Sequence, residues 1–219
     1  MQSFLQVQWR VTPLKTPRPW LHCPRCDART PFISSGKFRV NAQKKRLDAW
    51  LVYRCAHCEQ SWNFPVLERR PVNGIGPTIL RALMENDTAL AWRHAFDLTR
   101  LGRHSSQIES FAELSVEKQL LSPLDGDATH AEIAIAAPYD CGVRLDKLLA
   151  TELGLSRSAI ERLTDEKALT VLPASRRALK QLVRDGQRIT IDARALPFAG
   201  RSLFTRVSAG PAIPEAHRP

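Results

Sequence analysis

The sequence lacks any apolar run that could cross a membrane, since a spanning helix needs about 18 consecutive apolar residues. Its first residues, Met1 to Gln6, also lack the basic and then apolar layout of a secretion signal. These two absences predict a cytoplasmic protein with no membrane partner.

Motifs of common enzymes are missing as well. The sequence contains no G-x-S-x-G, no G-x-x-x-x-G-K-[ST], no G-x-G-x-x-G and no H-E-x-x-H. Asn73-Gly74-Ile75-Gly76 has two glycines without the rest of a nucleotide fingerprint, so a turn explains it better. His94 and His104 are interpreted as core or surface histidines. The sequence therefore favours a protein without catalytic activity, and no small-molecule substrate is expected.

Acidic residues are few relative to basic ones. The 219 residues hold 22 Asp and Glu against 32 Lys and Arg, for a net charge of +10. A surplus of this sign favours polyanions such as nucleic acid. The surplus lies in residues 1–70 and 143–219, whereas residues 71–142 carry 10 acidic against 5 basic residues. We expect two basic ends around an acidic middle.

Cysteine is scarce too, and four of the five cysteines form two C-x-x-C pairs, Cys23 with Cys26 and Cys55 with Cys58. A predicted hairpin lies between the pairs, so two facing turns can present four thiolates at the tetrahedral corners that zinc prefers. Disulfides fit a cytoplasmic chain poorly, and a redox pair would need a helix start in a βαβ context. The pattern predicts one structural zinc. Cys141 is expected to be a small packing residue.

This arrangement of two pairs around a hairpin resembles a zinc ribbon. Asp27 and Glu59 follow the two pairs, at positions where ribbons often have Gly. His22 and His57 lie beside the cysteines and are alternative ligands or neighbouring donors, although ordinary loop histidines are the favoured interpretation.

Strand patterns dominate the first part of the chain. Leu5 to Val11 alternates strictly between apolar and polar residues, which predicts a half-buried strand. Residues 37–40 and 48–53 flank a basic stretch and predict a hairpin, and residues 61–66 alternate again. We therefore expect a ribbon domain over residues 1–70.

Helical patterns follow in residues 71–122. They predict helices around residues 79–84, from Asn86 or Asp87 to Gly102, and from a capping box at Ser106-x-x-Glu109 to Leu114. We expect residues 123–139 to form a linker and a short strand, residues 140–194 a small α+β module, and residues 195–219 a poorly ordered tail. The predicted fold class of the whole chain is α+β.

Residues 140–194 begin with two short amphipathic helices separated at Gly154. Ser156 or Ser158 caps the second helix, and the strands Leu169–Val171 and Arg188–Ile191 follow. This part resembles the S-four-type RNA-binding domain of small-subunit ribosomal protein four, pseudouridine synthases, a heat-shock ribosome-rescue protein and tyrosyl-tRNA synthetases. The matching residues are Arg144-Leu145-Asp146, Ser156-Arg157, Leu169 with Val171, and Gly186 before Ile189 and Ile191.

The module departs from this pattern at Lys167, which stands where a turn Gly is expected, at Leu172-Pro173, at Lys180 and at Gln187. The resemblance implies the fold of the module and RNA as its partner. The whole chain also resembles a family of bacterial proteins that share a ribbon, a helical middle and such a module, and that have no assigned function.

The start of the second helix offers free backbone N–H groups and a positive dipole end, which suit a phosphate. Arg157 is the strongest single candidate, because it matches the motif and sits at that helix start. The predicted RNA-binding residues are Arg144, Ser156, Arg157, Ser158, Arg162, Lys167, Arg176, Arg177, Lys180 and Arg188. Glu161, Asp165 and Glu166 share the second helix, so a plain charged surface or a protein partner stays an alternative.

A second basic patch is formed by Arg39, Lys44, Lys45 and Arg46 near Trp50, and a solvated hairpin tip and a nucleic-acid contact are equally favoured there. The five tryptophans as a group are interpreted as core residues rather than base-stacking platforms.

The function that follows is a non-enzymatic, zinc-containing protein that binds structured RNA or associates with ribosomes. A zinc-ribbon adaptor that binds protein is the first alternative. An RNA-modifying enzyme with an unrecognised active site is the second.

Overall fold

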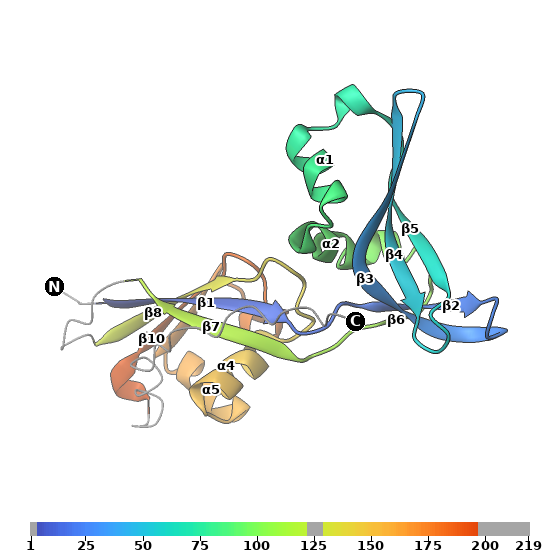
Figure 1. Ribbon diagram of the computed structural model, residues 1–219. Helices are drawn as coiled ribbons and strands as arrows, with labels where there is room; N and C mark the ends of the chain where they lie inside the picture. The colour runs from blue at the N-terminus through green and yellow to red at the C-terminus, as the bar shows by residue number, and fades with distance from the viewer. Residues whose placement is uncertain (1–3, 122–128, 197–219) are drawn as a thin grey trace. The chain divides into compact units, whose positions relative to one another are not determined.

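The computed structural model describes residues 4–121 and 129–196 (Figure 1). The chain divides into two compact units, a terminal unit of residues 1–13 with 112–219 and an inserted unit of residues 14–111. Each unit has a five-stranded sheet and a hydrophobic core of its own. The mixed α+β class is thus confirmed. Within the described ranges, no helix is long and apolar enough to cross a membrane.

The first strand, β1 (Phe4–Pro13), belongs to the terminal unit. It runs antiparallel to β7 (Leu114–Leu120) and parallel to β8 (His130–Ala136). The alternation that predicted this strand is present, since its apolar face is buried. That face packs into the core of the terminal unit. The predicted ribbon domain over residues 1–70 therefore differs from the observed unit, because β1 pairs with strands more than 100 residues away.

The sheet of the terminal unit has the order β7-β1-β8-β10-β9, with β9 (Leu169–Leu172) and β10 (Arg188–Asp192) antiparallel to each other. The helices α4 (Leu145–Leu153) and α5 (Arg157–Asp165) supply apolar residues to the same core. Gly154 ends α4 in the left-handed conformation, with φ of 65°. The side chain of Ser156 caps α5 by accepting from the amide of Ala159 at 3.1 Å. Two short 3-10 turns complete the unit, η2 (Ala178–Lys180) and η3 (Ala193–Ala195).

The sheet of the inserted unit is antiparallel throughout, in the order β5-β4-β3-β2-β6. The predicted hairpin and third strand are present, and their strands are longer than expected. The strands of this sheet are β2 (Arg18–Cys23), β3 (Ala28–Gln43), β4 (Arg46–Cys55), β5 (Ser61–Pro71) and β6 (Ile108–Glu109).

One face of this sheet is covered by helices (Figure 1). After the 3-10 turn η1 (Val72–Gly74), these are α1 (Pro77–Met84), α2 (Thr88–Ala95) and α3 (Leu98–Leu101). The single helix expected up to Gly102 is therefore two helices, each capped by an aspartate. Their buried leucines and alanines pack against alternate residues of β4 and β5.

The prediction of a third helix that begins at the capping box of residues 106–109 is wrong. Ile108 pairs with Pro19 of β2, and the carbonyl of Gln107 accepts from the amide of Trp20 at 2.9 Å. Strand β7 then begins at Leu114 and pairs with β1. A local helix signal gave way here to backbone pairing with distant strands, which satisfies the same amide groups.

Two expected segments lie partly outside the described residues. The predicted linker and short strand span residues 123–139. Residues 123–128 of this segment lie outside the described residues, and the short strand corresponds to β8. Of the predicted tail, the structure describes only residues 195 and 196, and Leu196 is buried in the core of the terminal unit.

Candidate functional site

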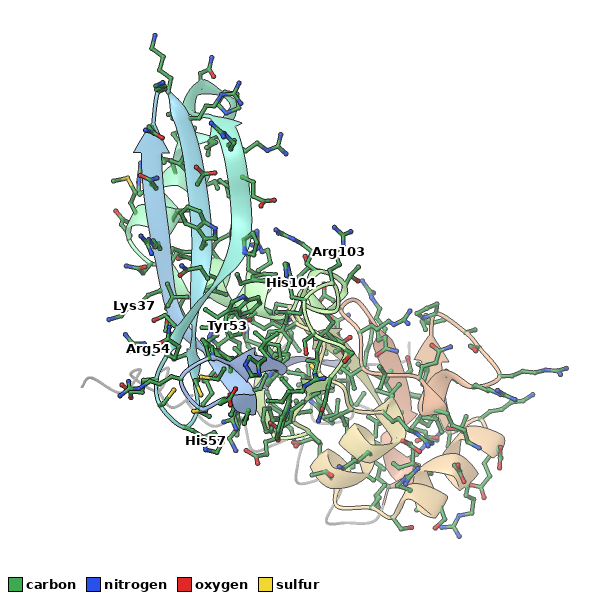
Figure 2. The ribbon with its side chains drawn as sticks, turned by 90° about the vertical axis from the view of Figure 1, so that its right-hand side faces the viewer. Lys37, Tyr53, Arg54, His57, Arg103 and His104 are labelled. Atoms are coloured by element: carbon green, nitrogen blue, oxygen red, sulfur yellow. The ribbon has the colours of Figure 1, made fainter. Side chains whose placement is uncertain are left out.

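The four paired cysteines lie in two turns at one end of the inserted sheet. Cys23 ends β2 and Cys26 lies in the turn before β3, and likewise Cys55 ends β4 and Cys58 lies in the turn before β5. Because β3 and β4 are neighbours, with Phe32 opposite Cys55, the two turns face each other. The sulfur atoms gather near His57 in Figure 2.

The sulfur atoms are close enough to share one ion. Cys23 Sγ lies 3.5 Å from Cys58 Sγ, and Cys26 Sγ lies 3.9 Å from Cys55 Sγ. All four ligand atoms lie within 4.8 Å of one another, and all four thiols are free. Sulfurs about 2.3 Å from a tetrahedral metal are about 3.8 Å apart, so these separations match such a site. The four cysteines predicted as ligands therefore form a cluster that could hold a metal ion.

The backbone of both turns is left-handed where ribbons often have glycine. The φ angles of Asp27 and Glu59 are 48° and 60°. In the second turn, the amide of Glu59 donates to the carbonyl of Cys55 at 3.0 Å, and the amide of Cys55 donates to the carbonyl of Gln60 at 2.9 Å. The turns thus adopt the conformation that glycine favours, although both residues carry side chains.

Polar groups around Cys55 favour its thiolate. Burial opposes ionisation, but hydrogen bonds from Thr30 Oγ1 at 3.2 Å and from the amide of His57 at 3.5 Å outweigh it and lower the pKa of Cys55 to about 6. The hydrogen bond with Cys58, with burial, raises the pKa of Cys26 to about 12. Thr30 was not found from the sequence, because nothing in the local pattern marks it.

The histidines beside the cysteines stay outside this cluster. In the described part of the chain, the group of potential ligands consists of the four cysteines alone. His22 is exposed and lies 3.7 Å from the carboxylate of Asp27, and His57 is exposed as well. Cys141 is buried in the core of the terminal unit, where burial raises the pKa of its thiol to about 11.

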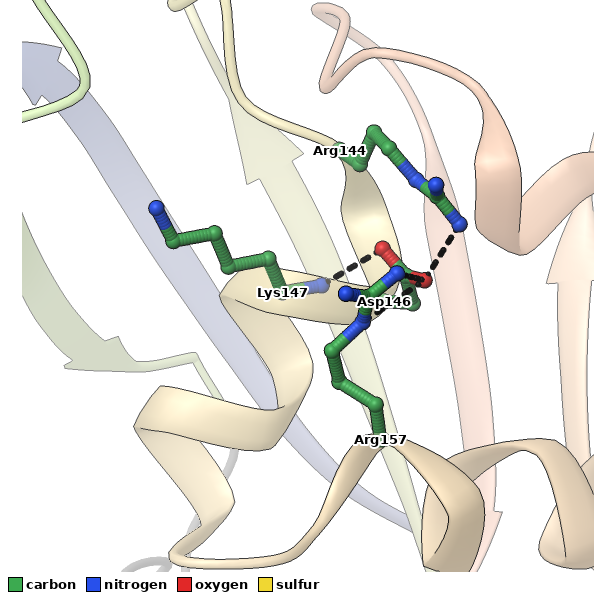
Figure 3. Close-up of polar contacts among 4 residues, drawn as sticks. All are labelled: Arg144, Asp146, Lys147 and Arg157. Atoms are coloured by element: carbon green, nitrogen blue, oxygen red, sulfur yellow. Dashed lines mark hydrogen bonds and ion pairs between the residues drawn. The ribbon is translucent and has the colours of Figure 1, made fainter.

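A buried carboxylate organises the start of the two helices in the terminal unit (Figure 3). Asp146 is 0% exposed. Its Oδ2 accepts from Arg144 at 2.6 Å and from Arg157 at 2.8 and 3.2 Å, and its Oδ1 accepts from the amide of Lys147 at 2.8 Å. Burial alone would raise the pKa of Asp146, but the hydrogen bonds from Arg157 and the charge of Arg144 lower it.

This contact changes the role expected for Arg157. The guanidinium predicted as the main phosphate contact is bound to Asp146, and Arg144 shares the same oxygen. Sequence reasoning missed Asp146 as a site residue, although it belongs to the motif that was quoted. A buried carboxylate with two arginines is hard to foresee, because Arg157 lies 11 residues further along the chain.

A cleft of about 450 Å³ lies beside α5, β9 and η2. Three of the predicted RNA-binding residues, Arg176, Arg177 and Lys180, line it. Glu161 and Asp165 of α5 line it too, so the cleft is polar and of mixed charge.

The other predicted RNA-binding residues are spread over the surface of the unit. Ser156 Oγ caps α5 and lies 3.0 Å from Ser158 Oγ. Arg162 and Lys167 are exposed at and beyond the end of α5, and Lys167 has a φ of 59°. Arg188 is bound to Glu132 at 3.2 Å. The structure therefore brings together the basic segment after β9, but does not join all ten residues into one track.

Comparison with known proteins gives one match. Residues 40–177 match the family described as "Protein of unknown function (DUF1062)", and this range holds Cys55, Cys58, Asp146 and most of the cleft. No curated protein and no solved structure matches the chain. Since the match covers more than half of the sequence, the chain belongs to the DUF1062 family.

Proposed function

We propose that this protein is a non-enzymatic RNA-binding protein with one structural zinc. The zinc is held by Cys23, Cys26, Cys55 and Cys58 in a zinc ribbon formed by the two turns of the inserted unit. Four thiolates close the coordination shell, so no position is left for a substrate or a reactive water. The ion would link the two turns to each other, because each turn supplies two of the four thiolates.

Metal content tests the first half of this proposal. Freshly purified, unchelated protein should contain one zinc per chain by elemental analysis. The Cys55→Ser variant should contain none, and Cys141→Ser, which changes a buried thiol of the other unit, should keep it. A wild-type protein with well under one zinc per chain, or with another metal in its place, would contradict the proposal.

RNA binding is assigned to the terminal unit, as an S-four-like module. This assignment rests on three basic residues that line the cleft beside α5, Arg176, Arg177 and Lys180. All three side chains are exposed, and among the described residues none of them lies within 4.0 Å of a carboxylate, unlike Arg144, Arg157 and Arg188. They are therefore the module's best-placed cations for phosphate oxygens.

The acidic wall of the cleft also suits RNA. Glu161 and Asp165 face the basic segment and could accept hydrogen bonds from ribose 2′-hydroxyl or base amino groups. In this arrangement Asp146 acts indirectly. It holds Arg144 at the start of α4 and Arg157 at the start of α5, so that the helix pair beside the cleft keeps its geometry.

Salt-dependent titration tests RNA binding. Affinity for structured RNA should fall linearly with salt on a logarithmic scale between about 50 and 200 mM, because phosphate contacts release counterions. Arg177→Ala should lower the affinity and reduce the slope by roughly 1. Arg10→Ala is the matched control, since it removes an exposed arginine of β1 outside the cleft. A wild-type protein that binds no structured RNA at about 50 mM salt would contradict RNA binding and favour a zinc-ribbon adaptor that binds protein. An affinity that changes neither with salt nor with Arg177→Ala would lead to the same conclusion.

A further inference from the structure

The inserted sheet has a second face, opposite the helices α1 and α2, which Figure 2 views from the front. Along β4, Leu47, Ala49, Leu51 and Tyr53 are buried against the helices. The alternate residues therefore point to this open face. In the described part of the chain, none of the helices packs on that side.

The open face is strongly basic. Its outward rows carry Lys37 and Arg39 on β3 and Arg46 and Arg54 on β4, and Lys37, Arg39 and Arg54 are exposed. Lys37 and Arg54 are labelled in Figure 2. The acidic member of these rows, Asp48, accepts a hydrogen bond from the amide of Arg69 at 2.7 Å. Arg54 also lies 3.8 Å from the carboxylate of Glu59, and both of these side chains are exposed, so the pair is weak in water and leaves Arg54 accessible to a phosphate. Four cations against two carboxylates leave a surface suited to a polyanion.

An aromatic side chain lies in the middle of this basic surface. Trp50 pairs with Arg39 of β3 on one side and with Pro65 of β5 on the other. It is partly exposed and is not among the residues that pack into the core of the inserted unit. The expectation that the tryptophans are core residues holds for Trp9, which is buried. The other four, Trp20, Trp50, Trp62 and Trp92, are partly exposed.

We propose that this open face binds single-stranded RNA, with a base stacked on Trp50 and the backbone held by Arg39 and Arg54. A flat aromatic ring between cations is the arrangement by which sheet surfaces bind unpaired bases. A duplex hides its bases, so it would gain only the phosphate contacts. The surface shares no residue with the cleft of the terminal unit. The inference rests on the proposed function only for the choice of RNA over DNA as the ligand.

The experiment compares full-length variants by fluorescence anisotropy with a labelled 12-nucleotide oligouridine at about 50 mM salt. Trp50→Ala should weaken binding by about five- to hundredfold, because each stacked base contributes roughly that factor. Trp50→Phe should retain most of the affinity. Arg54→Ala should reduce the salt slope by about 0.7, as expected for one phosphate contact to a single strand. Arg103→Ala, which removes an exposed arginine after α3 and off this face, is the matched control.

Folding and the second site are controlled separately. Zinc content and the thermal unfolding midpoint of Trp50→Ala should match wild type, and if they do not, Trp50→Phe and Arg54→Ala carry the test. Arg177→Ala should leave oligouridine binding unchanged. A loss with Arg177→Ala but not with the Trp50 and Arg54 variants would overturn the inference and leave the proposed function intact. Loss of structured-RNA binding alone would overturn only the proposed function.

Three further ligands test the specificity of this surface. A 12-base-pair RNA duplex should bind more weakly than oligouridine, and equal binding would overturn the stacking on Trp50. Oligothymidine of the same length should also bind more weakly, and equal or tighter binding would overturn the choice of RNA. Binding of an acidic polypeptide such as polyglutamate as tightly as oligouridine would show a general polyanion surface and overturn the inference.

Discussion

The four cysteines of the cluster differ in their surroundings. Cys23 and Cys55 are buried, whereas Cys26 and Cys58 are partly exposed. Cys55 also ends β4 and makes hydrogen bonds to Thr30 and His57. A substitution at Cys55 therefore removes a ligand and a packed, hydrogen-bonded side chain at once.

We predict that Cys55→Ser abolishes metal binding and destabilises the inserted unit by several kcal/mol, because structural zinc sites contribute folding free energy directly. Elemental analysis and thermal unfolding measure both effects. Cys26→Ser should lose the metal with a smaller loss of packing. A Cys55→Ser protein that keeps its metal would show that the cluster is not the site.

Asp146 is the second residue whose environment decides a measurable property. Since its pKa is lower in the folded protein, the carboxylate stabilises the fold above the unfolded pKa of about 4, and this contribution is lost as the pH falls through the folded pKa. We predict that Asp146→Asn lowers the free energy of unfolding by about 1–3 kcal/mol at pH 7. The difference from wild type should shrink below pH 4.

Urea unfolding at pH 7, 4 and about 3 measures this difference. Asp165→Asn, at an exposed position of α5, is the control and should change the stability little at any of these pH values. A deficit of Asp146→Asn that is the same at pH 7 and pH 3 would mean that the charge of Asp146 does not stabilise the fold.

At the scale of the elements, β1 joins the terminal unit although it precedes the inserted unit. Trp9 of β1 is 1% exposed, and Lys118 of β7 lies 4.7 Å from its ring centre. We predict that Trp9→Ala costs about 3–5 kcal/mol and weakens the terminal unit selectively. Amide hydrogen exchange should accelerate in β8 and β10 and stay slow in β3 and β4.

The matched substitution is Phe64→Ala, which empties a fully buried position of the inserted unit. It should give the opposite pattern of exchange. If Trp9→Ala accelerated exchange in β3 and β4 instead, the first strand would belong to the ribbon domain, as the sequence pattern had indicated.

The junction between α4 and α5 depends on one glycine. Gly154 has a φ of 65°, and a Cβ at this position would meet no atom within 4 Å, so only the backbone conformation opposes a side chain. Gly154→Ala should therefore cost about 1 kcal/mol. Gly76→Ala, where φ is −57°, should be nearly neutral. Chemical denaturation measures the free energy of unfolding of the two variants. Equal values for Gly154→Ala and Gly76→Ala would contradict the role of Gly154 as a left-handed helix cap.

At the scale of the whole molecule, the two units have separate cores, and the cysteine cluster lies in one of them. Removing the metal with a chelator at neutral pH should therefore destabilise residues 14–111 and leave the terminal unit folded. Hydrogen exchange with and without chelator measures this difference. Equal loss of protection in both units, or none in residues 14–111, would contradict it.

The sequence by itself determined the cysteine cluster, the β3–β4 hairpin and the helix pair around Gly154. These features depend on signals within a few residues, such as the C-x-x-C spacing, the alternation along β4 and the serine at the start of α5. Such local patterns survive into the fold, because each satisfies its own backbone groups or ligands.

Only the tertiary structure decided which unit β1 completes, that residues 106–109 pair with β2, and that Arg157 binds Asp146. Trp50 was likewise left facing outward by the pairing of three strands. An alternating strand fits any sheet with an open edge, and an arginine suits any carboxylate or phosphate. Which sheet a strand joins is therefore decided by the core that its apolar face fills, and which group an arginine binds is decided by the buried carboxylate that needs a counter-charge. In both cases the deciding residues lie far away along the chain.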